Sequence, residues 1–252
     1  MMDTVSQLNR EFSAQDFSRG GSELRLLDRC RAIAENYARM EHAIAVLSDL
    51  QAKVSYIYYG AFARTLGIGR SGEIREVSSI WEEEIFRMIH PDDLARKHLQ
   101  ELCFFHFVKR QPRKKRSEYH LISKLRMRIG TNAYMPVLHR MFYVSTSSNE
   151  TQWLALCLYS PLFFDIPASY MIVNSTDGHI AESEALGHTK ILSSREKQIL
   201  RLIDRGLTSK EIAAMLCISV NTVSRHRQEI LSRLRVKNSI EACRMAKDLK
   251  LL

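Results

Sequence analysis

The chain has 252 residues, of which 45% are hydrophobic and 26% charged, and its formal net charge is +9. This length accommodates two compact domains, or one large one, without covalent cross-links. The five cysteines are scattered, without the spacing of a zinc site or a disulfide framework, which indicates a reducing compartment. Residues 1–21 lack the apolar core of a signal peptide, and no stretch is as long as a membrane span. These features argue against a secreted or membrane-spanning protein and predict a cytoplasmic one.

The positive charge is concentrated near the C-terminus. Residues 190–252 contain 14 Lys and Arg against 6 Asp and Glu, a net charge of +8, whereas residues 1–189 contain 23 against 22, a net charge of +1. A basic region fits nucleic acid or an acidic membrane surface, and it is also compatible with a merely solvated surface.

We expect residues 1–21 to be a flexible N-terminus and residues 22–50 to form one long helix. Apolar side chains recur there at alternating steps of four and three, which is a heptad pattern: Leu26, Cys30, Ile33, Tyr37, Met40, Ile44 and Leu47. Two alternatives stay open. The helix could pair with that of a second subunit, or it could pack on its own domain.

Residues 51–165 have the pattern of an antiparallel sheet with short helices. Residues 54–59 are β-branched and aromatic, and residues 119–129, 134–146 and 152–159 follow as three strands with turn residues between them. The last of these is apolar on both faces, which predicts a central strand with something packed against each side.

Candidate ligand residues in this region have simpler structural explanations. His90, Asp92 and Asp93 could form a metal or acid–base cluster, but with the intervening proline they also mark the start of a helix reaching about residue 108. Cys103 and His106 are spaced as metal or haem ligands could be, yet buried core residues are the better interpretation. We predict no metal, no cofactor and no catalytic residue.

Residues 54 to about 165 resemble a PAS domain, through their order of elements and through the motifs Trp81–Ile85 and His90–Leu94. PAS-like domains bind small molecules, bind partner proteins or only dimerise, and the sequence leaves the ligand unknown. Residues 166–189 are polar and predict a linker, with one more short strand at 170–173.

Residues 190–252 contain four helix starts. Three pair a capping residue with a glutamate three positions later, namely Ser193 with Glu196, Thr208 with Glu211 and Asn238 with Glu241, and Ser219 supplies the fourth cap. The expected inward-facing residues are Ile199, Leu202, Ile203, Ile212, Ala213, Leu216, Val223, Ile230, Leu234, Ile240, Ala242 and Met245.

Only Cys217 and Ile218 separate the second helix from the next cap, so these helices form a helix-turn-helix, with the third helix entering the major groove of DNA. Its outward face is polar and has no acid. It consists of Asn221, Ser224, Arg225, Gln228 and Ser232. Arg and Gln suit base edges, and Lys210 and Thr222, near helix starts, are expected to contact phosphates.

The stretches Leu192–Glu196, Gly206–Ala213 and Ile218–His226 closely resemble the LuxR-type (GerE-like) helix-turn-helix. The resemblance implies a bacterial regulator that binds DNA as a dimer, with the dimer contact on the fourth helix, residues 238–250. Ser224 stands where many members have lysine, so the base preference of better-known relatives does not carry over.

The sequence therefore predicts an α+β protein: a PAS-like sensor or dimerisation domain, preceded by a long helix, and an all-α four-helix domain at 190–252. The predicted function is a DNA-binding transcription regulator whose partners are double-stranded DNA, a second copy of itself and, as a candidate, RNA polymerase. The alternatives for the helical domain are a sigma-factor-like or protein-interaction role, and the strand-rich residues 119–159 do not supply the helical polymerase-binding domain of the former. An enzyme is not favoured, since no phosphate-binding glycine loop, nucleophile elbow or zinc-protease pair is present.

Overall fold

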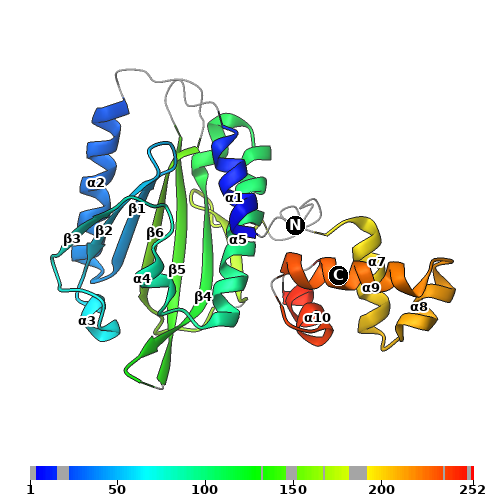
Figure 1. Cartoon of the computed structure of the whole chain (residues 1–252). Coiled ribbons are helices and arrows are strands. Elements are labelled where there is room, and N and C mark those ends of the chain that lie inside the picture. The colour runs from blue at the N-terminus through cyan, green and yellow to red at the C-terminus, as the bar shows by residue number, and fades with distance from the viewer. Residues whose placement is uncertain are drawn as a thin grey trace.

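The computed structural model describes residues 4–15, 23–131, 133–145, 152–166, 168–181, 192–234, 236–248 and 251–252. The chain is an α+β protein with a sheet-containing N-terminal region and a helical C-terminal region (Figure 1). The two regions touch through Arg96 and Asp248, whose side chains form an ion pair of 3.1 Å, and through a 3.4 Å hydrogen bond from the Thr4 hydroxyl to the Arg233 carbonyl.

The N-terminal region is built on one seven-stranded sheet of order β3-β2-β1-β6-β5-β4-β7, in which all neighbours are antiparallel. The strands are β1 (Ile44–Asp49), β2 (Val54–Tyr59), β3 (Ile74–Val77), β4 (Tyr119–Ile129), β5 (Ala133–Ser145), β6 (Gln152–Pro161) and β7 (Tyr170–Asn174). The four strands expected within residues 51–165 are confirmed, and the strand expected at 170–173 is β7, which pairs with β4.

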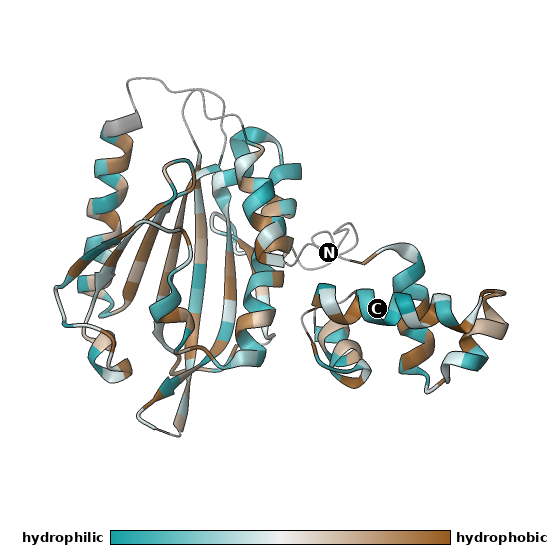
Figure 2. Ribbon diagram, in the orientation of Figure 1, coloured by the Kyte–Doolittle hydropathy of each residue, from teal (hydrophilic) through white to brown (hydrophobic). Residues whose placement is uncertain are grey.

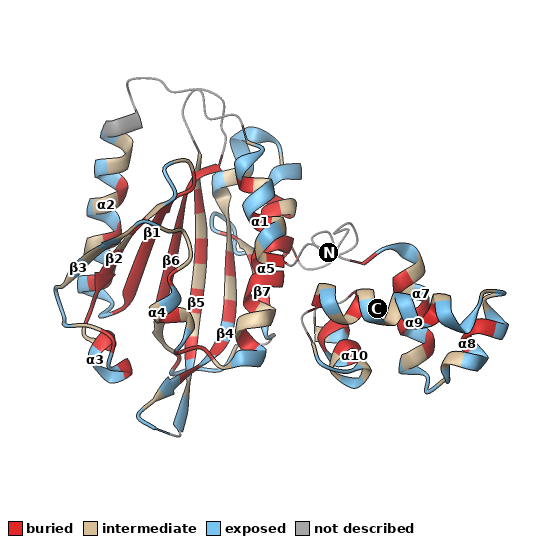
Figure 3. Cartoon of the chain, viewed as in Figure 1, coloured by how far each residue is buried: buried red, intermediate tan, exposed pale blue. Residues whose placement is uncertain are grey.

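Strand β6 lies at the centre of the sheet with both faces covered, as its apolar sequence predicts (Figure 3). On one face Leu154, Leu156 and Leu158 pack in a cluster with the buried side of α2 (Glu23–Met40). On the other face Ala155, Cys157 and Tyr159 join the main core, to which α5 (Pro91–Arg110) and α1 (Thr4–Ser13) contribute. The sheet is therefore the middle layer of three.

The expected single helix over residues 22–50 is wrong. Helix α2 ends at Met40, and the six buried residues of β1 follow, paired with β2 on one side and β6 on the other. The heptad spacing continues into β1 only because Ile44 to Leu47, in a strand buried on both faces, are all apolar. Helix α2 packs on the sheet through Cys30, Ala34 and Ala38, while Ile33 stays 49% exposed.

The N-terminus is also more ordered than expected. Residues 4–13, predicted to be flexible, form α1, in which Leu8 and Phe12 are buried. The Phe12 ring makes an edge-to-face contact with Phe105 of α5 at a centroid distance of 5.1 Å. An amphipathic helix too short to be stable alone is thus held by packing.

Short helices connect the outer strands: α3 (Phe62–Leu66), α4 (Glu83–Phe86) and the 3-10 turn η1 (Arg113–Glu118), which lies in the basic stretch after α5. Residues 167 and 182–189 of the linker expected at 166–189 lie outside the described residues. The domain boundaries at 51–165, 166–189 and 190–252 stay predictions.

The C-terminal region is all-helical, with α7 (Ser194–Asp204), α8 (Ser209–Met215), α9 (Val220–Leu234) and α10 (Ser239–Asp248). Its core contains the expected residues except one. Ile240, predicted to face inward, is 83% exposed, and Ala242, Cys243, Met245 and Ala246 form the buried side of α10 instead. The helical period counted from Ala242 and Met245 places Ile240 on the opposite side.

Candidate nucleic-acid interface

All four predicted helix starts in the C-terminal region are capped by hydrogen bonds. Ser193 and Glu196 form a capping box, in which the Ser193 hydroxyl accepts from the Glu196 amide at 3.2 Å and the Glu196 carboxylate accepts from the Ser193 amide at 2.6 Å. Thr208 and Glu211 repeat this arrangement, the side chain of Asn238 accepts from the Glu241 amide at 2.9 Å, and the Ser219 hydroxyl accepts from the Thr222 amide at 3.0 Å. These caps fix where each helix begins.

The turn between α8 and α9 is short and internally bonded. The Ile218 amide donates to the Ala213 carbonyl at 3.0 Å, and Cys217 adopts a left-handed conformation with φ 51°. This conformation ends a helix and reverses the chain within two residues. Arg195 of α7 donates to the Leu216 carbonyl at 3.1 Å, which holds the turn from outside.

Helix α9 is fixed from behind by apolar packing and by one arginine. Val223, Ile230 and Leu234 are buried toward the other helices. The Arg227 guanidinium donates to the Ser209 hydroxyl of α8 at 2.8 Å and to the Ser239 hydroxyl of α10 at 2.9 Å. The outward face of α9 is therefore held on a rigid support, as a surface that reads DNA needs to be.

The predicted site residues lie on α8 and α9, and all except Thr222 are exposed. Asn221, Ser224, Arg225 and Gln228 are exposed on α9, where much of the helix is hydrophilic (Figure 2). Thr222 is half-buried in the first turn of α9, where its hydroxyl contacts that of Ser219 at 2.8 Å. Lys210 is exposed in the first turn of α8.

One acid reaches this face, contrary to the prediction that it has none. Glu229 lies one helical turn after Arg225, and its carboxylate is 3.5 Å from the Arg225 guanidinium and 3.4 Å from the His226 ring. The spacing of four residues between Arg225 and Glu229 would have indicated this ion pair. The pair is solvent-exposed on the arginine side, so it orients Arg225 without burying it.

In the N-terminal region, the residues considered as an acid–base cluster serve the start of α5. The His90 ring accepts from the Asp92 amide at 3.3 Å, as a helix cap does. Asp93 accepts from the side chain and the amide of Arg126 at 2.8 Å each, and from Arg96. Burial raises the pKa of the Asp93 carboxyl, but the hydrogen bonds from Arg126 and Arg96 outweigh burial and hold that pKa below its usual range. Asp93 is therefore a structural anion.

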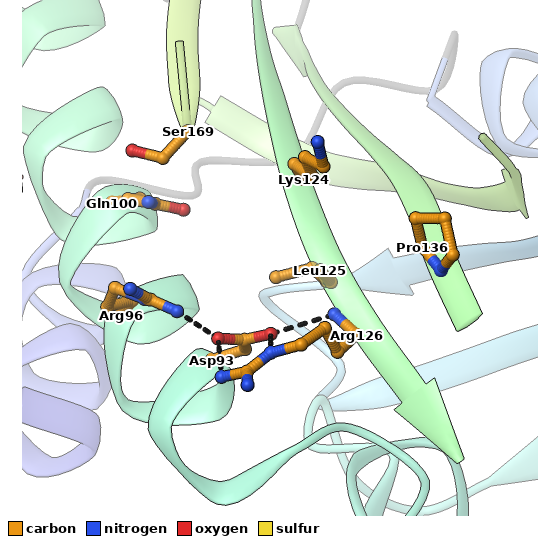
Figure 4. A pocket seen from close by; sticks show the side chains of 8 residues that line it. All are labelled: Asp93, Arg96, Gln100, Lys124, Leu125, Arg126, Pro136 and Ser169. Carbon is orange, nitrogen blue, oxygen red and sulfur yellow. Dashed lines mark hydrogen bonds and ion pairs between the residues drawn. The ribbon is translucent and has the colours of Figure 1, made fainter. Parts of the chain in front are cut away.

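A pocket of about 200 Å³ lies beside this ion pair, between α5 and β4 (Figure 4). Gln100, Lys124 and Ser169 line its other end. The other pair considered as ligands is separated, because Cys103 is buried in the core while His106 lies 3.6 Å from Glu11 of α1. Among the described residues, no helix is long and apolar enough to cross a membrane.

Comparison with known proteins assigns the helical region to a family. Residues 190–246 match the family described as "Bacterial regulatory proteins, luxR family". The Oxygen regulatory protein NreC of Staphylococcus aureus is 46% identical over 63 residues, which are 25% of this chain and 29% of that protein. The chain thus spans less than a third of the length of the curated relatives it matches.

Solved structures give weaker similarities over more of the chain. A phage VqmA–DPO complex covers 90% of this chain and 88% of that one, with 15% identity and a TM-score of 0.32. A Vibrio cholerae VqmA dimer covers 84% and 85% with 16% identity and a TM-score of 0.30, and Escherichia coli SdiA covers 98% and 97% with 15% identity and a TM-score of 0.26. TM-scores this low do not establish a common fold.

Proposed function

We propose that this chain, whose residues 190–246 form a LuxR-family helix-turn-helix domain, is a transcription regulator that binds double-stranded DNA through α9. The observation that supports this most is the construction of α9. One face is anchored by buried residues and Arg227, and the other presents four exposed polar side chains, namely Asn221, Ser224, Arg225 and Gln228.

Each side chain is given a role from its chemistry and position. Arg225 and Gln228 lie in the middle of α9 and carry groups that pair with guanine and adenine edges, so they are assigned to base readout. Lys210 and Thr222 lie in the first turns of α8 and α9, where helix dipoles and free amides favour phosphate. They are therefore assigned to contacts with the phosphates of the DNA backbone. Asn221 and Ser224 flank Arg225 and complete the face.

We further propose that the protein acts in the cytoplasm as a homodimer on a two-fold symmetric site. Two exposed apolar surfaces support self-association: Ile240 on α10 is 83% exposed, and Met40 at the end of α2 is 81% exposed. RNA polymerase is proposed as a further partner of the DNA-bound dimer. No catalytic activity is assigned to the chain.

The test compares Arg225→Ala with Lys210→Ala in the full chain, on a selected DNA site and on random DNA. Arg225→Ala is expected to lose about 1 to 3 kcal/mol at the selected site and little on random DNA. Lys210→Ala is expected to weaken both alike and to reduce the salt slope by about one unit, because one fewer counterion is released. Titrations at several salt concentrations measure both.

Arg201→Ala is the matched control, because Arg201 is an exposed arginine on α7, outside the two helices that carry the proposed contact residues. It removes the same charge and should leave specificity unchanged. If Arg225→Ala and Arg201→Ala lost equal affinity for both DNAs, the basic domain would bind DNA without sequence specificity. Absence of DNA binding by the intact chain would favour the protein-interaction or sigma-like alternatives.

A further inference from the structure

A cluster of buried polar side chains lies between the sheet and α5, far from the DNA-binding face. Glu101 comes from α5, His139 from β5 and Cys157 from β6, and their exposed fractions are 4%, 0% and 7%. His139 is paired with Tyr159 and Cys157 with Met141, so both side chains point to the same face of neighbouring strands. A carboxylate oxygen, a ring nitrogen and the sulfur all lie within 4.8 Å of one another.

Several polar atoms of this cluster lack partners. Neither ring nitrogen of His139 has a hydrogen-bond partner among the described residues, and the same holds for the hydroxyls of Tyr143 and Tyr159. The His139 Nε2 atom lies 3.8 Å from a Glu101 oxygen, which is beyond hydrogen-bond distance. Buried polar groups are nearly always bonded to something, so an unpartnered imidazole at 0% exposure points to a ligand that the protein itself does not supply.

The charges around the cluster can balance a bound divalent cation. Lys97 donates to Glu101 at 2.6 Å, and Glu82 accepts from the hydroxyls of Ser48 at 3.1 Å and Ser55 at 3.0 Å. Burial raises the pKa of the Glu82 carboxyl, so Glu82 holds a proton more readily than an exposed glutamate does. If a divalent ion displaces the thiol proton of Cys157 and the proton of Glu82, both of which leave to solvent, the whole group stays neutral. Buried charges are tolerated when they are balanced in this way.

We propose that Glu101, His139 and Cys157 form a binding site for one divalent transition metal ion of the Zn²⁺ type. A thiolate, an imidazole and a carboxylate are the ligands this ion prefers, and three protein ligands leave a fourth position for water or a tyrosine oxygen. Zn²⁺ binds such atoms at about 2.0–2.3 Å in a tetrahedron, which places them roughly 3.3–3.7 Å apart. The ligand atoms, which lie within 4.8 Å of one another, therefore have to move closer together by side-chain rotation when the ion binds.

Lys97 fits this assignment as a positioning residue. A carboxylate that binds a metal through one oxygen is normally held by a hydrogen bond to the other, which orients it. Lys97 donates to Oε1 of Glu101, which is also the oxygen 3.8 Å from His139 Nε2, so the carboxylate has to rotate for one oxygen to keep the lysine bond while the other binds the ion.

The experiment uses the full-length protein, stripped of metal and titrated with Co²⁺, and then with Zn²⁺ in competition. We expect one Co²⁺ per chain, with an absorption band for thiolate-to-metal charge transfer that Zn²⁺ abolishes. Cys157→Ser should remove the band, and Glu101→Gln and His139→Gln should each weaken binding at least tenfold. Cys30→Ser is the matched control, because Cys30 is a buried cysteine on the opposite face of the sheet, and it should keep the band.

Circular dichroism and tryptophan fluorescence identify variants that do not fold. If Cys157→Ser does not fold, Glu101→Gln and His139→Gln still test the site. A wild type that binds no Co²⁺ with this band, or a folded Cys157→Ser protein that keeps it, overturns the proposal, as does loss of the band in folded Cys30→Ser. Because no DNA is present, these outcomes are separate from those that test the proposed function. The second group of ligand-type residues, Glu196, His226 and Glu229, has no sulfur and cannot give the band.

Discussion

The two capping boxes of the helical domain have the same sequence pattern but different surroundings, so we expect the same substitution to destabilise them unequally. The side chain of Glu196 is 1% exposed, and its second oxygen lies 3.2 Å from Arg233 of α9. Within the described part of the chain, the carboxylate of Glu211 bonds only Thr208, at the surface. We predict that Glu196→Ala destabilises the domain much more than Glu211→Ala.

The size of the effect follows from what Glu196→Ala removes. The variant loses the 2.6 Å hydrogen bond from the Ser193 amide and the contact with Arg233. Breaking a buried ion pair costs about 3–5 kcal/mol when the remaining charge stays buried. Arg233 is 39% exposed, so water solvates part of its guanidinium in the variant, and we expect a loss of roughly 2–3 kcal/mol.

The assay makes use of the aromatic composition. No Trp, Tyr or Phe residue lies after position 170, and the two tryptophans, Trp81 and Trp153, belong to the sheet region. In urea, tryptophan fluorescence therefore reports the unfolding of the sheet region, and far-ultraviolet circular dichroism also reports the unfolding of the helices. Glu196→Ala should move a dichroism transition to lower urea and leave the fluorescence transition in place. Equal shifts for Glu196→Ala and Glu211→Ala would refute the argument that burial sets the cost.

Three further predictions use the same methods. Cys217→Gly should stabilise the helical domain by about 0.5–1 kcal/mol in urea titrations, since φ 51° strains a residue with a Cβ. Ile240→Glu should weaken self-association in sedimentation, with Met215→Glu, another exposed apolar side chain, as control. Asp93 has a lowered pKa despite burial, so its contribution to stability is present above the unfolded pKa of about 3.9 and is lost as pH falls through the lower folded value. Asp93→Asn should reduce the free energy of unfolding, measured by fluorescence, at pH 7, and this free energy should then fall less steeply as the pH is lowered. The same dependence on acidic pH in Asp93→Asn and wild type would contradict this.

The helical domain was predictable because its signals are local. A cap and its glutamate lie three residues apart, and the inward face of α9 follows from the period of one helix. Residues within one helical turn of each other therefore determine both the helix start and its buried face. Ile240 was misplaced because it follows the cap Asn238 by only two residues, where the first turn has no preceding turn to fix its face.

The sheet was predictable where strands are long and alternate, as in β4, whose bounds match the expectation at 119–129. It was not predictable at β1, because the apolar residues from Ile44 to Leu47 fit a heptad as well as a strand. The choice is made by partners distant in sequence: Ile44 lies opposite Tyr59 of β2 and Tyr159 of β6. Tertiary pairing of this kind overrides local pattern.

The buried cluster shows the same limit in a stronger form. Glu101, His139 and Cys157 are separated by long stretches of chain, and each alone reads as an ordinary member of its helix or strand. For Cys157 alone the sequence indicated burial, because the stretch from Trp153 to Tyr159 is apolar on both faces of the strand. What joins the three is the packing of α5 across β5 and β6, which follows from the antiparallel order of the sheet. The base-reading face proposed on α9 therefore follows from the sequence period of one helix, whereas the proposed metal site exists only when the sheet is assembled.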